Sequence, residues 1–540
     1  MLEEVEAQVV VIGSGPSGAV VSHTLATSGI DVLCLEQGDW VSPSDYPANH
    51  RMWELVARSH WATQPKARQN LADYPLGDEF ADLSPSMYSA VGGSSVHYGA
   101  LWPRMTESDF RVRSQDGVAS DWPISYDDLV PCYAEVDAFI GVSGLDGDPA
   151  YPLGLAYPQP PQALGKTGLS AARACNDLGW HWWPGTHAIP THPHGDLAGC
   201  QRWGTCVQGC PEGSKASFDI AYWPAAIRAG ARLSTGARVE RIETSDDDRV
   251  SAVSYIDTDG VQHRVITNQV VVCGNGIGTP RLLLLSATSR HPDGLANSSG
   301  MLGRNLMMHP CSCVFGYYDE DLETWRGPLG AVVASMEFYD TRPEYDFVRG
   351  FKMHASTVPG LIMAGVDPHR SLPFDELWGA RFHDVVRKAA STVLWSAQVD
   401  DLPDPENRVV LSRSLVDSSG LPGAEVHYQY SENTQKLRHH AVRRMTEAHE
   451  AAGAKQTLAH LEMPGEPGHL LGTARMGDDP KTSVVDSFGR AHDVDGLRIA
   501  DGSVFVTGGA VNPTSTITAL ALRVARQLVA DLRASELSAT

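Results

Sequence analysis

The stretch Val9-Val10-Val11-Ile12-Gly13-Ser14-Gly15-Pro16-Ser17-Gly18 decides the fold of this chain. Its first four residues are apolar and mostly β-branched, which predicts a buried strand, and residues 19–28 have the pattern of a helix. Between strand and helix, three glycines stand at the G-x-G-x-x-G spacing of a dinucleotide-binding turn. Gly13 allows the tight turn, Gly15 lets the backbone approach a pyrophosphate, and Gly18 lets the helix pack close to the strand.

A second apolar run, residues 31–35, ends at Glu36. This is about where an acidic residue holds the adenosine ribose of a bound dinucleotide. A carboxylate there repels a 2′-phosphate, so NADP is disfavoured. The motif leaves FAD and NAD open, and the alternative is a doubly wound fold whose glycine turn holds nothing.

Composition narrows the class of protein. The chain has 540 residues, which at the usual size of a domain corresponds to about three to four domains. Of its residues, 42% are hydrophobic. There are 42 Lys and Arg against 65 Asp and Glu, a formal net charge of −23, which argues against nucleic acid or an anionic membrane as a partner. No apolar run has the length of a membrane span, and the acidic start lacks the features of a signal peptide. The cytoplasm is the expected location.

The cysteines and histidines do not predict a metal site. The nine cysteines are sparse and odd in number, which indicates reduced thiols. Four histidines between positions 181 and 194 are interrupted by prolines and fit no helical ligand spacing. Cys200, Cys206 and Cys210 lack the fourth ligand of a zinc or iron–sulfur site. Structural cysteines in a compact loop are the expectation, with no metal.

Several further elements can be placed. Residues 269–273 predict a buried strand that enters a second strand–glycine–helix junction at residues 274–285, with Pro280 suited to its first helical turn. Ser125 is expected to cap a helix, and residues 431–452 predict a long helix capped by Ser431 and stopped by Gly453. Residues 38–87 show no sustained period. Residues 316–404 predict a separate module with its own sheet, in which residues 358–378 form a lid or a surface loop.

The densest chemistry lies near the C-terminus. His469-Leu470-Leu471-Gly472-Thr473-Ala474-Arg475-Met476-Gly477 is followed by a strand at residues 497–500 and then by Asp501-Gly502. Asn512-Pro513-Thr514 opens the closing helix, with Pro513 at its first position. Asn512 can be a helix N-cap, and the N-terminus of this helix also favours an anion in front of it.

Taken together, the motifs resemble those of the glucose–methanol–choline (GMC) oxidoreductases. They are the opening turn with Glu36, Gly92-Gly93-Ser94-Ser95, residues 121–126, 278–283 and 303–310, His469-x-x-Gly472-Thr473-x-Arg475-Met476-Gly477, and Asn512-Pro513-Thr514. The resemblance covers nearly the whole chain and is most specific at its two ends. Within the family the chain looks most similar to pyranose oxidases and bacterial glycoside 3-oxidases (C-glycoside oxidases).

The resemblance implies an α/β fold, α+β overall, with FAD as the cofactor. A Rossmann-type FAD-binding domain would be assembled from residues 1–120, 196–312 and 462–540. A substrate-binding domain with a mostly antiparallel sheet and helices would comprise residues 121–195 and 313–461.

The same resemblance implies the site residues. His469 and Asn512 would form the catalytic pair. Glu36 would bind the adenosine ribose, Val239 the adenine end, and Asp501 and Gly502 the region of the phosphates and ribityl chain. The full set expected at FAD is Gly13, Ser14, Gly15, Ser17, Gly18, Glu36, Gly92, Gly93, Ser94, Ser95, His97, Val239, Asp501, Gly502, Asn512 and Thr514.

The chain departs from the family pattern in places. Asn275 and Gly276 replace the small pair that is usual at the second junction, which puts that cofactor contact in doubt. His97 matches the position where some pyranose oxidases attach the flavin covalently, but Val96 and Tyr98 differ from their neighbours. Non-covalent FAD is the expectation, and a covalent link through His97 is the alternative. Asn512 stands where many members have a second histidine, which favours the pyranose-oxidase side.

The implied reaction is oxidation of a secondary hydroxyl of a sugar or glycoside. His469 would act as general base, since a neutral imidazole suits that task near pH 7, and Asn512 would orient the hydroxyl. Reoxidation by O2 to hydrogen peroxide is expected. The alternatives are a dehydrogenase that uses a quinone or protein acceptor, a nicotinamide dehydrogenase, and a non-catalytic flavin-binding protein.

Overall fold

A five-stranded parallel sheet brings distant parts of the chain together. The structure is a computed structural model that describes residues 3–57, 59–68, 74–358, 360, 362–369, 378–463 and 468–539. The sheet has the order β18-β10-β2-β3-β6, and all neighbouring strands run parallel. Its strands are β2 (Val9–Ile12), β3 (Val32–Leu35), β6 (Arg232–Ser234), β10 (Val270–Val272) and β18 (Leu497–Ile499).

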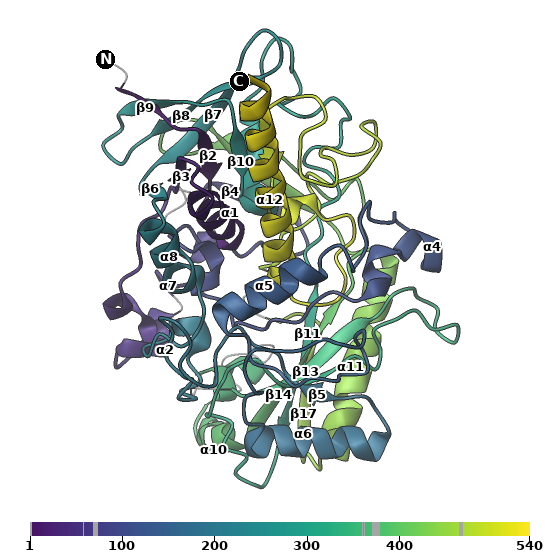
Figure 1. Ribbon diagram of the computed structural model, residues 1–540. Helices are drawn as coiled ribbons and strands as arrows, with labels where there is room; N and C mark the ends of the chain where they lie inside the picture. The colour runs from purple at the N-terminus through teal and green to yellow at the C-terminus, as the bar shows by residue number, and fades with distance from the viewer. Residues whose placement is uncertain are drawn as a thin grey trace.

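Helices cover this sheet, which explains its apolar strands. All residues of β2, β3, β10 and β18 are buried, as expected for parallel strands with both faces covered. Helix α1 (Pro16–Thr27) packs against α8 (Trp223–Arg228) and the closing helix α12 (Thr514–Ala539). Figure 1 shows α1 and α12 side by side, with both termini at the same end of the molecule. The predicted first helix exists, and it begins at Pro16, three residues earlier than expected.

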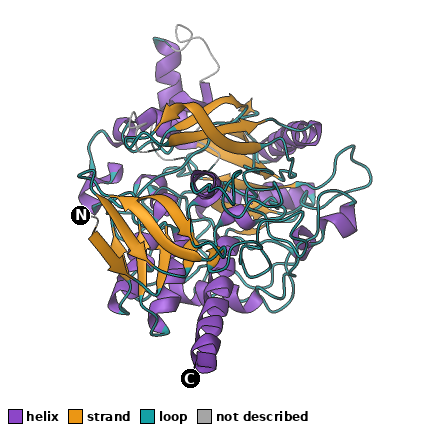
Figure 2. Ribbon diagram, turned by 90° about the horizontal axis from the view of Figure 1, so that it is seen from above, coloured by secondary structure: helices purple, strands orange, loops and turns teal. Residues whose placement is uncertain are grey.

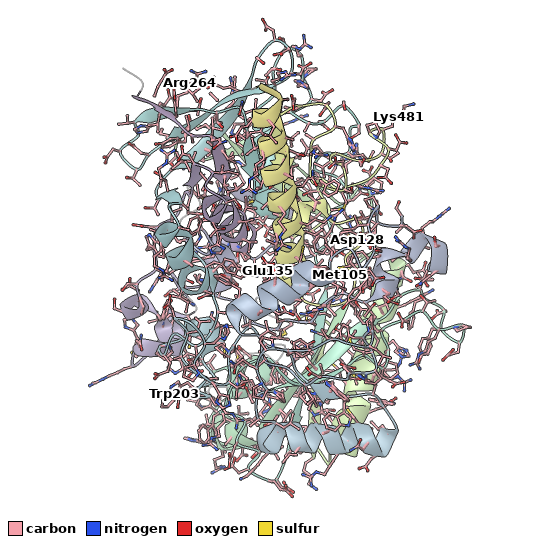
Figure 3. All side chains as sticks on the ribbon, viewed as in Figure 1. Met105, Asp128, Glu135, Trp203, Arg264 and Lys481 are labelled. Carbon is pink, nitrogen blue, oxygen red and sulfur yellow. The ribbon has the colours of Figure 1, made fainter. Side chains whose placement is uncertain are left out.

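Helix α5 (Val130–Ile140) packs against α12 near the middle of the molecule. Glu135 of α5 lies beside α12 in Figure 3, and its carboxylate pairs with Arg526 of α12. The expectation that Ser125 caps this helix is wrong. The cap residue is Leu129, and the Ser125 hydroxyl donates to the Asp128 carboxylate in the preceding turn.

A six-stranded sheet fills the lower half of Figure 1 and is antiparallel throughout its assigned pairs. Its order is β17-β11-β14-β13-β12-β5. The strands are β5 (Trp183–Pro184), β11 (Cys311–Tyr317), β12 (Ala331–Ser335), β13 (Phe351–Ser356), β14 (Thr392–Val399) and β17 (Gln456–His460). This is the separate sheet predicted for the middle of the chain.

The two faces of this sheet have different chemistry. Phe351, Met353 and Ala355 of β13, with Trp395 and Ala397 of β14, form one core with the helices behind them. Those helices are α6 (Gly165–Leu178) and α11 (Glu432–Ala451). Because side chains alternate along a strand, the intervening residues of β13 and β14 point to the opposite face. These are Lys352, His354 and Ser356, with Leu394, Ser396 and Gln398 paired across from them.

Two smaller sheets complete the strands, which are orange in Figure 2. One joins β1 (Glu3–Glu6), β9 (Gln262–Ile266), β8 (Val250–Ile256) and β7 (Arg238–Thr244). The other joins β15 (Arg408–Val416), β16 (Pro422–Tyr428) and β4 (Leu76–Ala81). Strand β4 lies in the region predicted to be loop-rich. It is half exposed and irregular, so its sequence shows no clear alternation.

The expected mixed architecture, parallel and antiparallel sheets with helices, is confirmed. The division into two domains stays a prediction, and its boundary passes through the β15-β16-β4 sheet. Helix α11 is capped as predicted, with the Ser431 hydroxyl accepting from the Thr434 amide and Gly453 at a φ of 84°. The predicted lid or loop at residues 358–378 lies partly outside the described residues, at 359, 361 and 370–377.

The remaining helices are short or lie at the surface. They are α2 (Trp53–Val56), α3 (Pro65–Arg68), α4 (Val112–Asp116), α7 (Phe218–Ala221) and α10 (Ala380–Lys388). Across the described ranges, every helix is too short or too polar to cross a lipid bilayer.

Helix α9 (Asn275–Leu285) contains Pro280 in its interior, not in its first turn as expected. A proline brings no N–H to the carbonyl four residues before it, which here is the carbonyl of Gly276. The Thr473 hydroxyl donates to that carbonyl at 2.8 Å, and Thr473 is fully buried. The loop that carries His469 therefore satisfies the backbone group that Pro280 leaves free.

Replacing Thr473 with valine should destabilise the fold by about 1–3 kcal/mol, since the Gly276 carbonyl then stays buried without a partner. Chemical denaturation measures this change in the free energy of unfolding. Thr446→Val in α11 is the matched control. Its hydroxyl bonds the Val442 carbonyl, which also accepts a helical amide, so the loss should be smaller. Equal effects of the two substitutions would contradict the role given to Thr473.

Candidate active site

A cavity of about 800 Å³ lies at the carboxyl ends of β2, β3 and β10, where Ile12, Leu35 and Val272 line it. Open parallel sheets bind ligands at this edge. The polar face of the six-stranded sheet lines the same cavity through His354, Ser356, Leu394, Ser396 and Gln398. The cavity therefore connects the glycine turn with the antiparallel sheet.

Most of the residues predicted at the cofactor line this cavity. They are Gly13, Gly15, Ser17, Glu36, Gly93, Ser94, Ser95, His97, Val239, Asp501, Gly502, Asn512 and Thr514, and His469 joins them. Ser14, Gly18 and Gly92 lie behind the lining. Ser14 donates to Glu36 through both its amide and its hydroxyl, at 2.8 and 2.7 Å. Gly92 has a φ of 87°, and a Cβ there would lie 2.6 Å from the Asp219 amide nitrogen.

The three glycines of the opening turn are needed for different reasons. A Cβ on Gly13 would lie 2.5 Å from the Cys273 carbonyl oxygen, and one on Gly18 would lie 1.9 Å from the Gly13 oxygen. These two glycines are required by the packing of the chain itself. A Cβ on Gly15 would have no neighbour nearer than the Gly93 Cα at 4.0 Å, and its φ of −63° suits any residue. The space beside the Gly15 Cα, where a side chain would lie, is therefore not filled by other protein atoms.

At the other end of the cavity, His469 stands between two polar partners. Its Nε2 lies 3.4 Å from Nδ2 of Asn512, and its Nδ1 lies 3.0 Å from Nδ1 of His309. His309 and His469 meet because Met307 and Leu471 form an antiparallel bridge, which places residues two positions away opposite each other. Behind Asn512, the Lys352 ammonium donates to Oδ1 at 2.5 Å.

His309 and Lys352 are buried, His469 and Asn512 are half-buried, and their removal from water sets the protonation of the two imidazoles. The pKa of His469 lies well below its usual value, first because of burial and then because of His309 and the positive charge of Lys352. Burial also lowers the pKa of His309 to about 4. Both imidazoles are therefore neutral near pH 7.

Two family models described as GMC oxidoreductase match residues 82–311 and 403–521, and one described as FAD binding domain matches residues 6–47. The chain belongs to the GMC oxidoreductase family. This confirms the resemblance to the GMC family, including an enzyme that acts on CH–OH groups with FAD as its cofactor, while the pyranose-oxidase and glycoside 3-oxidase branch stays a prediction.

Relatives of this GMC oxidoreductase share its whole length. It is 41% identical to 2-methyl-1,2-propanediol dehydrogenase of Mycolicibacterium austroafricanum over 96% of this chain and 94% of the relative. It is 30% identical to the fructose dehydrogenase large subunit of Gluconobacter japonicus (98% and 99%) and 33% identical to paromamine 6′-oxidase of Streptomyces fradiae (97% and 91%).

The fold of this chain is similar to that of a solved structure. The crystal structure of pyridoxine 4-oxidase from Mesorbium loti matches with a TM-score of 0.63 and 19% identity, covering 97% of this chain and 99% of that one. At this identity the match shows the fold alone.

The residues present fit FAD. The open space over Gly15 is a cradle for a pyrophosphate, and α1 begins at the next residue, so its N-terminus faces the same place. Glu36 is held by Ser14 and by the Gly38 amide at 2.8 Å, while burial raises its pKa. Asp501 accepts from the Asn275 amide at 2.9 Å and from Ser503, which fixes its carboxylate beside the start of α9.

Asn275, the departure from the family pattern, has a local structural role. It adopts a φ of 68°, a conformation that asparagine tolerates. Its Oδ1 accepts from the Ile277 amide at 2.9 Å, and its Nδ2 donates to the Tyr74 hydroxyl at 3.1 Å. The side chain therefore caps the helix start in place of the usual small residue.

His97 lines the cavity from the loop after Gly92–Val96. Its ring lies 4.2 Å, between centroids, from both Trp61 and Tyr88, and its Nε2 has no hydrogen-bond partner among the described residues. Burial lowers its pKa well below the usual value. The Lys215 ammonium holds this loop by donating to the Val96 carbonyl at 2.7 Å. A covalent link through His97 stays a prediction.

In the described ranges, no group of three or more His, Cys, Asp or Glu side chains is arranged to hold a metal ion. Cys200, Cys206 and Cys210 are free thiols there. The residues that sequence reasoning missed are Lys352, His354, Gln398 and the partnership of His309 with His469. The alternation of apolar and polar residues in Phe351-Lys352-Met353-His354-Ala355-Ser356 is the signal that could have found the first two.

Replacing Gly15 with valine should leave the FAD-free protein as stable as wild type and weaken FAD binding by about 100-fold, or ~2.7 kcal/mol. The new side chain would occupy the space proposed for the pyrophosphate, and its Cβ would lie no closer than 4.0 Å to the rest of the protein. Titration of flavin fluorescence measures the affinity, and thermal unfolding of the FAD-free protein measures stability.

Gly18→Ala is the contrasting variant. It should destabilise the FAD-free protein as well, because its Cβ collides with the Gly13 carbonyl. Wild-type FAD affinity in Gly15→Val would show that this turn does not hold the pyrophosphate.

Proposed function

We propose that this GMC oxidoreductase oxidises a secondary hydroxyl of a neutral sugar or glycoside, with His469 as the general base. The observation that carries the proposal is His469 beside Asn512 in the cavity that the glycine turn also lines. The low pKa of His469 leaves its Nε2 able to accept the hydroxyl proton near pH 7. Asn512, 3.4 Å away, can hold the same hydroxyl oxygen and orient the C–H bond.

FAD supplies the hydride acceptor when it is bound. The residues proposed to hold it are Glu36 at the adenosine ribose, Val239 at the adenine, Gly15 at the pyrophosphate, Asp501 and Gly502 near the phosphates and ribityl chain, and Gly92–Ser95 beside the isoalloxazine. All of these except Gly92 line the cavity.

The proposed substrate class rests on the polar face of the six-stranded sheet. His354, Ser356, Ser396 and Gln398 line the cavity there with uncharged groups. The Gln398 Oε1 and the His354 Nδ1 are buried without hydrogen-bond partners among the described residues. Buried polar atoms are usually paired, so these two suit the hydroxyl groups of a bound neutral polyol. The pyranose-oxidase and glycoside 3-oxidase branch, which the motifs resemble, supports a sugar or glycoside.

O2 is the proposed electron acceptor, giving hydrogen peroxide. A dehydrogenase with an external quinone or protein acceptor is the second candidate. It is favoured by the 41% identity to a protein named a diol dehydrogenase and by the similarity to the fructose dehydrogenase large subunit. The oxidase is favoured by the motif resemblance and by the similarity to paromamine 6′-oxidase.

Replacing His469 with alanine should slow flavin bleaching by substrate by about two to four orders of magnitude, the usual size of a general-base contribution. Anaerobic stopped-flow absorbance measures the rate. FAD content and the unfolding midpoint should stay at wild-type values, which separates a catalytic loss from a structural one. A rate within threefold of wild type would remove His469 from this role.

Anaerobic mixing with glucose, O-glycosides, C-glycosides and 1,2-diols identifies the substrate class. We expect the sugars or glycosides to bleach the flavin at lower concentrations than the diols, because more hydroxyls can pair with the sheet face. Admitting air then distinguishes the acceptors. Return of the yellow colour within seconds with peroxide supports the oxidase, whereas return only with an added quinone supports the dehydrogenase. Bleaching by diols alone would overturn the sugar assignment.

A further inference from the structure

Lys352 is a buried cation next to the catalytic pair. It lies on β13 with 2% of its surface exposed. Its ammonium donates to Oδ1 of Asn512 at 2.5 Å, on the side of the amide away from His469. Lys352 is not among the described residues that line the cavity, whereas Asn512 and His469 are. It therefore touches the catalytic pair from behind.

We propose that Lys352 is a positioning residue that fixes the Asn512 amide with Nδ2 toward His469 and so keeps Nε2 of His469 free of its proton. This inference rests on the proposed role of His469 as the base, and it names what sets the protonation of that base.

The hydrogen-bonding capacity of each group determines which way the Asn512 amide is turned. A lysine ammonium has three donors and no acceptor, so the amide atom that faces it must be the oxygen. The amide nitrogen then faces His469, and it can only donate. An imidazole nitrogen that receives such a donor must offer its lone pair, which makes Nε2 the unprotonated nitrogen of His469.

The other side of His469 agrees with this direction. A neutral imidazole with a free Nε2 carries its proton on Nδ1. That proton points to Nδ1 of His309 at 3.0 Å, which accepts it. His309 then carries its own proton on Nε2, which lies beside the Gly508–Gly509 backbone. Each group in this series therefore donates a hydrogen bond to the next, from Lys352 to Asn512, then to His469 and then to His309.

If the Asn512 amide were rotated by half a turn, both of its hydrogen bonds would be disturbed. The Nδ2 group would face the ammonium, donor against donor, and Oδ1 would require a proton on Nε2 of His469. The base would then have no lone pair toward the substrate. Lys352 thus selects the tautomer that catalysis needs, as the hydrogen bond on one ring nitrogen commonly does for the other.

Several titratable and charged groups surround His469. His309 and Lys352 act directly on His469, and Asp400 and Lys352 act on His309. Asp400 is paired with the Arg349 guanidinium at 2.8 Å. His354 lies beside Lys352 on the same strand, and His187 is a neutral imidazole near both of them. Removing the charge of Lys352 therefore removes a cation that lowers the pKa of His469, and the pKa should rise.

The experiment uses the FAD-loaded protein with Lys352→Met, which has similar length and no donor, and Lys352→Arg, which keeps the charge and the donors. We expect Lys352→Met to slow flavin bleaching by about 10–100-fold, the size of a small misplacement of a catalytic group. The acid limb of its pH–rate profile should move to higher pH. Substrate KM and FAD content should change less than threefold, and Lys352→Arg should recover part of the rate.

Ser312→Ala is the matched control. Its hydroxyl is a fully buried donor in the same sheet, bonded to the Leu461 carbonyl at 2.8 Å and not lining the cavity. It should leave the rate and the pH profile unchanged.

A second measurement does not depend on turnover. Histidine-selective ¹⁵N labelling, with His469→Gln to assign the signals, reports which ring nitrogen of His469 carries the proton. We expect protonated Nδ1 in the wild type and a mixture of tautomers in Lys352→Met. An unchanged tautomer and an unchanged rate in Lys352→Met would overturn the proposal, as would a rise in KM alone, which would make Lys352 a substrate-binding residue. A tautomer that changes in a protein whose His469→Ala variant keeps its activity would preserve the positioning and overturn the proposed base.

Discussion

The structure depends on the pairing of β10 with β2 on one side and with β18 on the other. Val270 faces Val10 and Leu497, so strands separated by hundreds of residues end at one edge of a single sheet. The cavity proposed to hold FAD lies at that edge. The glycine turn leaves β2, α9 leaves β10, and Asp501 leaves β18, all toward the same cavity. The burial of these strands on both faces makes the pairing rigid.

The second constraint is electrostatic. The catalytic end of the cavity is enclosed by a sheet whose residues are all buried on β11, β13 and β14. Charges there persist only when they have partners. Arg349 is paired with Asp400 and Asp109, and Lys352 meets the oxygen of an amide. The imidazoles of His309 and His469 remain neutral. The direction of the hydrogen bonds, more than net charge, therefore determines which atoms of the site donate and which accept.

The sequence allowed the cofactor end to be predicted because local chemistry determines it. A β-branched run, three glycines at fixed spacing and an acidic residue after the next strand specify one turn, and the structure has it at Gly13–Gly18. The catalytic roles of His469 and Asn512 were predicted only from their motifs, through the resemblance to a family, and they stay predictions. Lys352 was not predicted, because its contact with Asn512 spans 160 residues of the chain. The prediction that Pro280 lies in the first helical turn was wrong. The Thr473 hydroxyl, which satisfies the carbonyl that an interior proline leaves free, is also distant in the chain.

The bond between Thr473 and the Gly276 carbonyl has a mechanical consequence. Thr473 is four residues after His469, and Gly276 lies in the first turn of α9, at the edge of the parallel sheet that lines the cavity. A further backbone pair joins the Gly472 amide to Gly502, beside Asp501. These two hydrogen bonds attach the loop that carries His469 to α9 and to the segment after β18, so we expect the loop and these segments to move together. If His469 is the base proposed above, its distance from the bound cofactor stays constant, and any adjustment to substrates of different shape comes from the opposite wall of the cavity.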